Sequence, residues 1–156
     1  MRLFVSFYLK IQDCLILLHY SITCLSLPKV YCIDNGLVNA VSFKFSENIG
    51  KAMENLVAVE LLRRGEEFYY WQDSSGKEID FVVKDDMEIK QLIQVCYNVE
   101  NPSTHERELR SLFKSSGKLK CNDLLVITND YKGEEEYKGI KIKFISLWEW
   151  LLLNHI

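Results

Sequence analysis

Two carboxylates of this sequence occupy surroundings that are otherwise apolar. Asp80 comes directly before the run Phe81–Val83, where a predicted strand becomes buried. A carboxylate at such a place is costly unless it is paired, hydrogen-bonded or bound to a metal ion. Glu54 has mainly apolar neighbours three and four positions away on a predicted helix. We expect the two carboxylates to converge at one site.

A second pair of candidate side chains lies on the next predicted strand. Gln94 and Cys96 are two positions apart within an apolar run. Because side chains alternate along a strand, both project to the same face. We therefore expect these side chains to lie beside Asp80.

A basic stripe follows on the second predicted helix. Four cationic residues recur there at steps of three, four and four, which places them on one helix face where they could contact phosphates. The alternative is a solvated face on which the arginines are balanced by Glu106 and Glu108. The four residues of the stripe are Arg107, Arg110, Lys114 and Lys118.

Several classes of protein are excluded or disfavoured by composition and motifs. The five cysteines have no CxxC spacing, which disfavours a disulfide framework and a thiolate zinc site. No Walker A motif is present, so this chain cannot hydrolyse ATP by the usual P-loop. The net charge is -3, so any contact with DNA must come from a local basic patch.

The elements that must position these residues alternate between strand and helix patterns. The 156 residues suit one domain, and 48% of them are hydrophobic. Ser103 and Glu106, beside Pro102, have the spacing of a capping box, and Glu60 and Arg64 are predicted to form a surface ion pair. We predict strands over 29–33, 67–72, 77–84, 88–97, 123–128 and 139–145, helices over 46–64, 101–116 and 146–153, and a charged loop over 132–138.

The segment 1–28 is a separate apolar region ahead of the domain at 29–156. Its apolar residues recur at steps of three and four between Leu3 and Leu25, which predicts an amphipathic helix. This helix packs on the domain or is the remnant of a junction with an upstream domain; an export or membrane signal is the alternative. Its uncharged run Cys14–Leu18 is too short to span a bilayer.

Three segments together resemble a known family. Residues 50–57 (GKAMENLV), 68–71 (FYYW) and 76–81 (GKEIDF) are similar to the C-terminal domain of archaeal-type AAA+ ATPases, and residues 31–41 resemble the stretch before it. The similarity covers roughly residues 29–153. That family has no known function and a restriction-endonuclease-like fold of the PD-(D/E)xK superfamily. The resemblance implies a three-layer α/β/α core with a mixed central sheet.

The resemblance also assigns roles to the candidate residues. In active nucleases of this fold, positions matching Glu54, Asp80 and Gln94 hold Mg²⁺ or Mn²⁺, and a lysine at the position of Cys96 activates water. Gln94 offers an oxygen without a charge, and Cys96 has no stable positive charge. The catalytic positions Asp80, Gln94 and Cys96 are therefore degenerate, which leaves open whether the chain is an enzyme.

Three functions follow as expectations. The first is a nuclease-like accessory module that binds nucleic acid or an AAA+ ATPase without robust nuclease activity. The second is an active Mg²⁺-dependent DNA endonuclease with an altered site, and the third is a structural protein-interaction domain. DNA, an AAA+ ATPase and self-association through the apolar N-terminal segment are the expected partners, with no membrane. Free thiols indicate a reducing cytoplasm.

Overall fold

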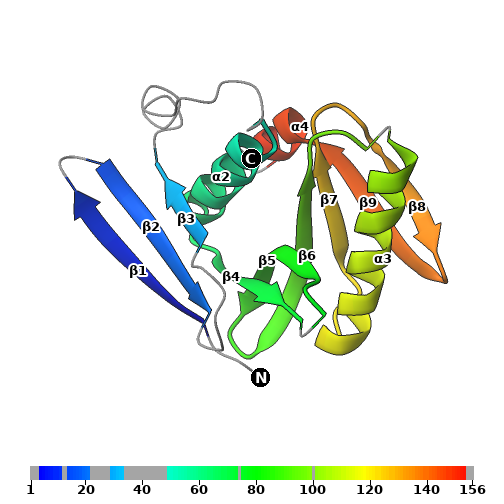
Figure 1. Cartoon of the computed structure of the whole chain (residues 1–156), viewed down its shortest axis with the longest axis horizontal. Coiled ribbons are helices and arrows are strands. Elements are labelled where there is room, and N and C mark those ends of the chain that lie inside the picture. The colour runs from blue at the N-terminus through cyan, green and yellow to red at the C-terminus, as the bar shows by residue number, and fades with distance from the viewer. Residues whose placement is uncertain are drawn as a thin grey trace. The chain divides into compact units, whose positions relative to one another are not determined.

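A computed structural model describes residues 4–11, 14–21, 29–33, 49–73, 75–99 and 101–153 (Figure 1). The chain divides into two compact units, Met1–Gly65 and Glu66–Ile156. The domain boundary predicted after residue 28 falls beside residues outside the described ranges and stays a prediction. The two units are described in turn.

Unit 1 contains a three-stranded antiparallel sheet in the order β1-β2-β3. Its strands are β1 (Phe4–Ile11), β2 (Cys14–Ser21) and β3 (Lys29–Cys32). The third strand lies within the strand predicted over 29–33.

The N-terminal helix expected between Leu3 and Leu25 is wrong over the described residues. β1 and β2 pair as a hairpin, from Phe4 opposite Ser21 to Ile11 opposite Cys14. Apolar residues also occupy every second position from Val5 to Ile11, a period of two that favours a strand. Because a mostly apolar segment satisfies both periods, pairing with a neighbouring strand decides between them.

The helix α2 (Ile49–Arg63) completes unit 1 and confirms the helix predicted from 46 to 64. Its predicted N-cap, Ser46, lies outside the described residues. Gly65 follows the helix with a φ of 72°, a left-handed conformation that glycine adopts without strain. Asn55 ties α2 to β3, because its side chain accepts from the Cys32 N–H at 2.7 Å and donates to the Cys32 carbonyl at 2.6 Å.

Unit 2 is built on a six-stranded mixed sheet in the order β4-β5-β6-β7-β9-β8. The β6–β7 and β7–β9 pairs are parallel, and the other pairs are antiparallel. This confirms the predicted mixed central sheet. The strands are β4 (Glu67–Gln72), β5 (Glu78–Asp85), β6 (Glu88–Cys96), β7 (Leu124–Thr128), β8 (Gly133–Tyr137) and β9 (Ile140–Ser146).

The core of unit 2 lies between the sheet and α3 (Pro102–Leu119) (Figure 1). All five residues of β7 are buried, as expected for a central parallel strand with both faces covered. Leu109 and Leu112 of α3 pack into the same cluster as Leu92 of β6. The short α4 (Leu147–Leu152) closes the chain. Among the described residues, no helix is long and apolar enough to cross a membrane.

The start of α3 differs from the predicted capping box. Asn101 is the N-cap, and its side-chain oxygen accepts from the backbone N–H of Ser103 at 3.0 Å. Ser103 is a donor here, since its hydroxyl also bonds Asn101 at 2.7 Å. Glu106 turns instead to Arg110 on the next turn of the helix. Asparagine is as good an N-cap as serine, and Pro102 suits the first helical position.

The charged loop predicted over 132–138 is wrong, because Gly133–Tyr137 forms the edge strand β8. In the β8–β9 register, Glu134 lies opposite Lys143 and Glu136 lies opposite Lys141. Opposite charges facing each other across strands stabilise such a pair. The acidic run 134–136 has the composition of a loop in the sequence, because the lysines that pair with it lie on the next strand.

Candidate functional site

The structure brings Asp80 and Gln94 together on neighbouring strands. Asp80 on β5 is buried, and its backbone N–H donates to the Gln94 side-chain oxygen at 3.4 Å. The Asp80 carboxylate accepts from the backbone N–H of Val95 on β6 at 3.0 Å. The sheet thus supplies a hydrogen bond to a buried charge that would otherwise be costly.

A carboxylate that the sequence interpretation did not single out joins this pair. Glu108 on α3 is buried, and its pKa is raised mainly by that burial and further by the charge of Asp80. Hydrogen bonds from Arg107, at 2.8 and 3.1 Å, and from Gln94 lower the pKa without offsetting the burial. Asp80, Gln94 and Glu108 therefore form one polar cluster between the sheet and α3.

Cys96 lies at the same cluster but supplies no charge. Its thiol is buried and donates to the Asn98 carbonyl at 3.6 Å. Burial, together with the charge of Glu108, raises the pKa of Cys96 to about 11. The side chain is therefore a neutral thiol at neutral pH.

Glu54 is held by other residues of unit 1. Its carboxylate accepts from the Lys29 ammonium at 2.7 Å and from the Tyr31 hydroxyl at 2.9 Å. Glu54 belongs to unit 1 and Asp80 to unit 2. The predicted meeting of the two carboxylates at one Mg²⁺ or Mn²⁺ site therefore stays a prediction. Within the described part of the chain, no three His, Cys, Asp or Glu side chains gather as they would around a metal ion.

The predicted basic stripe lies on the exposed face of α3, and most of it is paired within the chain. Arg107 bonds Glu108, and Arg110 forms an ion pair with Glu106 at 2.5 Å. The balancing of the arginines by these two glutamates, which was the alternative interpretation, is thus present. Lys118 forms an ion pair with Asp73 at 2.8 Å. Lys114 is the member of the stripe that has no ion-pair partner among the described residues.

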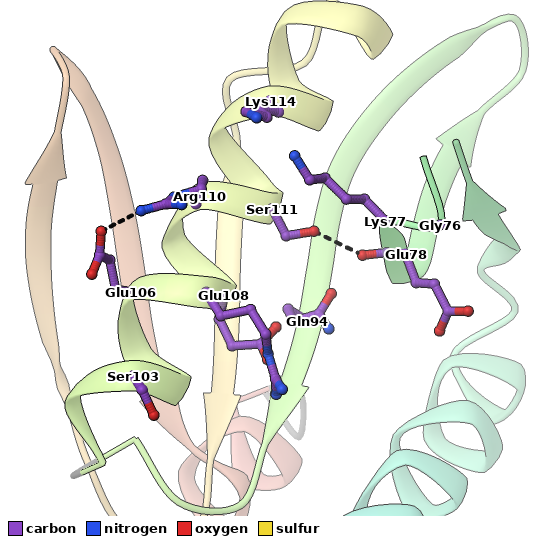
Figure 2. A pocket seen from close by; sticks show the side chains of 11 residues that line it. Gly76, Lys77, Glu78, Gln94, Ser103, Glu106, Glu108, Arg110, Ser111 and Lys114 are labelled. Atoms are coloured by element: carbon purple, nitrogen blue, oxygen red, sulfur yellow. Dashed lines mark hydrogen bonds and ion pairs between the residues drawn. The ribbon is translucent and has the colours of Figure 1, made fainter. Parts of the chain in front are cut away.

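A cavity of about 680 Å³ opens between α3 and the sheet, near the first residue of β5 (Figure 2). We call it the α3 cavity. Three members of the basic stripe line it, whereas Lys118 does not. Its lining residues are Gly76, Lys77, Glu78, Gln94, Ser103, Glu106, Arg107, Glu108, Arg110, Ser111 and Lys114.

Lys77 enters the α3 cavity from the turn before β5, and Figure 2 shows its side chain directed toward Lys114 on α3. The nearby ammonium of Lys114 lowers the pKa of Lys77. Asp73 fixes this turn by accepting from the Lys77 N–H at 2.9 Å and from the Ser75 N–H at 2.8 Å. The cavity therefore contains two like charges on different elements.

Two residues of this site, Lys77 and Glu108, are absent from the sequence-based candidates. A usable signal existed for Glu108, since it lies four and seven residues before Leu112 and Ser115, both buried. That spacing places its carboxylate on the buried flank of the helix. For Lys77, a lysine beside a glycine turn has no distinguishing local pattern.

Comparison with known proteins identifies a family. Residues 49–150 match the sequence model of a family described as "Domain of unknown function (DUF4143)". The matched range runs from the first residue of α2 to the buried Trp150 of α4.

Two curated relatives are uncharacterized proteins that are much longer than this chain. One, from Methanocaldococcus jannaschii, is 36% identical over 142 residues, covering 85% of this chain and 31% of the relative. The other, from Haemophilus influenzae, is 32% identical over 120 residues, covering 77% of this chain and 28% of the relative. The chain thus spans about a third of the length of the curated relatives it matches.

One solved structure aligns weakly. It is an assembly of Thermococcus gammatolerans McrB AAA+ hexamers with bound McrC, at 15% identity over 63% of this chain and 28% of that chain. The TM-score is 0.44, which is too low to support an argument about function or fold.

Proposed function

Since the chain belongs to the DUF4143 family of unknown function, we propose from its own residues that it is a nucleic-acid-binding accessory module of longer proteins. In this proposal it lacks robust nuclease activity. Binding uses the α3 cavity, where phosphates of a nucleic-acid backbone meet the basic side chains.

The observation that carries the proposal is the clustering of cations in one cavity of a chain whose net charge is -3. Four cationic side chains line the α3 cavity beside three glutamates, two of which pair with the arginines. The cations are Lys77, Arg107, Arg110 and Lys114. Contacts of lysine and arginine with phosphates supply most of the affinity of sequence-independent nucleic-acid binding. A local patch of this kind attracts a polyanion even when the whole protein is acidic.

The absence of robust hydrolysis is argued from Cys96. Metal-assisted hydrolysis of a phosphodiester needs an activated water as well as neutralisation of charge. Cys96 stands where the resemblance implies a lysine, and its pKa of about 11 keeps it a neutral thiol. Gln94, the other departure, contributes no charge to a metal ion.

The finer architecture and the partners belong to the same proposal. We infer a restriction-endonuclease-like core for unit 2 from the resemblance of residues 76–81 together with its mixed sheet. The relatives are more than three times as long as the matched region. We infer an AAA+ ATPase partner from the resemblance of residues 50–57, 68–71 and 76–81. Sedimentation of the chain alone tests self-association through the N-terminal segment. Sedimentation of the chain mixed with an AAA+ ATPase tests the second association.

The test of the proposed function is a pair of assays on the whole chain. Fluorescence anisotropy with labelled single-stranded and duplex DNA should give a dissociation constant of about 10⁻⁶ to 10⁻⁴ M that weakens steeply with added salt. In parallel, the same DNAs incubated with Mg²⁺ or Mn²⁺ should stay intact.

Two outcomes oppose the proposal in different ways. No salt-dependent binding to either DNA would overturn it. Binding accompanied by metal-dependent cleavage, abolished in Asp80→Ala, would replace it with the endonuclease alternative.

A further inference from the structure

Lys77 and Lys114 line the α3 cavity from two different elements, and the Lys77 side chain is directed toward Lys114 (Figure 2). Lys77 precedes the first residue of β5, and Lys114 lies in the C-terminal half of α3. We call these two residues the lysine pair. The proximity of Lys114 lowers the pKa of Lys77, because two like charges repel each other.

The backbone segments that carry the lysine pair are held together by hydrogen bonds. The turn before β5 is closed by hydrogen bonds between Asp73 and Lys77 in both directions, 2.8 Å from the Asp73 N–H to the Lys77 carbonyl and 2.9 Å in return. On the other side, the Ser111 hydroxyl donates to the Glu78 carbonyl at 3.1 Å and ties α3 to the start of β5 (Figure 2). The proximity of the two lysines is therefore a product of the fold.

The lysine pair differs from the arginines that share the cavity. Arg107 and Arg110 each bond a glutamate of α3. Asp73, the acidic group that faces Lys77, is already bonded to Lys118 at 2.8 Å. Among the described residues, no carboxylate lies within ion-pair distance of either lysine of the pair. In the part of the chain that the structure describes, the two lysines are therefore the cations of the cavity that have no ion-pair partner.

An anion placed between two ammonium groups relieves their repulsion and accepts hydrogen bonds from both. Lysine presents a compact charge with three donors on a flexible stem, which suits a phosphate oxygen approached from any direction. We propose that Lys77 and Lys114 jointly hold one phosphate group, either of a nucleic-acid backbone or of a free polyphosphate. The nucleic-acid form of this inference rests on the proposed function.

The first experiment compares three variants with the same change of charge. Lys77→Gln and Lys114→Gln each remove one member of the pair, and Lys141→Gln removes an exposed lysine of β9 as the matched control. For single-stranded DNA at low salt, we expect each pair variant to bind roughly threefold to tenfold more weakly. Lys141→Gln should bind like the wild type. Equal effects of all three variants would overturn the proposal, since they would report only net charge.

The salt dependence of binding tests whether one phosphate is shared. Each phosphate neutralised on a single strand contributes a slope of about 0.7 to the plot of log affinity against log salt. The double variant Lys77→Gln/Lys114→Gln should therefore lose about 0.7 of slope relative to the wild type. A loss of about twice that value would mean two separate phosphate contacts and would contradict a shared site.

A second ligand separates the subsite from the proposed function. Pyrophosphate is titrated into the wild type and the three variants, with the lysine side-chain resonances followed by NMR. Binding should shift the Lys77 and Lys114 signals and raise the pKa of Lys77, because the bound anion offsets the charge of Lys114. In Lys114→Gln the Lys77 signal should respond far more weakly, whereas Lys141→Gln should respond like the wild type; equal responses in the two variants would overturn the shared site.

The two arms give distinguishable failures. DNA binding that is insensitive to both pair variants would overturn the shared subsite and leave the proposed function standing. Pyrophosphate binding at the pair without any DNA binding would overturn the proposed function and support a site for free polyphosphates. The absence of both would overturn both.

Discussion

Glu108 and Glu60 are both buried carboxylates bound by arginine, but their pKa values move in opposite directions. Burial raises the pKa of Glu108, whose single arginine partner, Arg107, is largely exposed on α3. Glu60 receives bonds of 2.7 Å from both Arg63 and Arg64, and these lower its pKa to about 2. Burial prevails at Glu108, which lies deeper and has one arginine partner, and the two charged donors prevail at Glu60.

The first residue-scale prediction concerns Glu108→Gln. Because the folded protein raises the pKa of Glu108 above 4.5, the native state retains a proton there that the unfolded chain releases. The wild type therefore loses stability as the pH rises from 4.5 through the raised pKa. Glu108→Gln removes this loss, so its stability relative to the wild type should improve between pH 4 and pH 7, measured by urea unfolding at each pH. A difference that is constant with pH would contradict this assignment.

The second residue-scale prediction has the opposite sign. The pKa of Glu60 is lowered from 4.5 to about 2, so its ionised form stabilises the fold above pH 4.5, and this contribution disappears as the pH falls toward 2. Glu60→Gln should cost about 1–3 kcal/mol of unfolding free energy at pH 7. The cost should shrink in acid. The ion pair with Arg64 was predicted as a surface feature, but Glu60 is only 8% exposed.

At the scale of elements, α3 carries most of the candidate site, and its first turn depends on Asn101. Asn101→Ala removes the acceptor for the Ser103 N–H and should lower the unfolding free energy by about 1 kcal/mol. Asn101→Asp keeps an acceptor and favours the helix dipole, so it should match the wild type within a few tenths of a kcal/mol. Urea unfolding followed by circular dichroism measures both. Equal losses in the two variants would show that the cap is not the cause.

The pairing of β5 with β6 determines the position of Asp80 in the polar cluster. Phe81 lies opposite Ile93 in the antiparallel register, which places Asp80 beside Gln94. A shift of one residue between the two strands would put these side chains on opposite faces of the sheet. The geometry of the polar cluster is therefore set by strand register.

At the scale of the whole molecule, the question is whether the predicted carboxylates cooperate in holding a metal ion. Glu54 is neutralised by Lys29 within unit 1, and the Asp80 carboxylate already accepts from the Val95 N–H. We therefore expect no saturable binding of Mn²⁺ or Mg²⁺ at millimolar concentrations, measured by calorimetry and by melting temperature. Binding in the wild type that is lost in Asp80→Ala would contradict this and favour the endonuclease alternative.

Much of unit 2 was predictable because its signals are local. The apolar run of β7 and the helical spacing of Leu109 and Leu112 each lie within one element, and the strands at 67–72 and 88–96 were predicted to within one residue. The alternation that puts Gln94 and Cys96 on one face is likewise a property of a single strand. The spacing of apolar residues indicates which face of an element is buried, even when the element that packs against it is unknown.

What the sequence by itself determined is therefore the mixed α/β class, most element positions and the proximity of Asp80 to Gln94. The tertiary structure alone decided the N-terminal hairpin, the edge strand β8, the entry of Glu108 into the polar cluster and the approach of Lys77 to Lys114. Each of these features depends on contacts between residues that are distant in the chain. For the N-terminal hairpin, the apolar residues also fit both a helical and a strand spacing, so their spacing alone does not decide. Local patterns carry no information about which distant element supplies the partner, and packing free energy makes that choice.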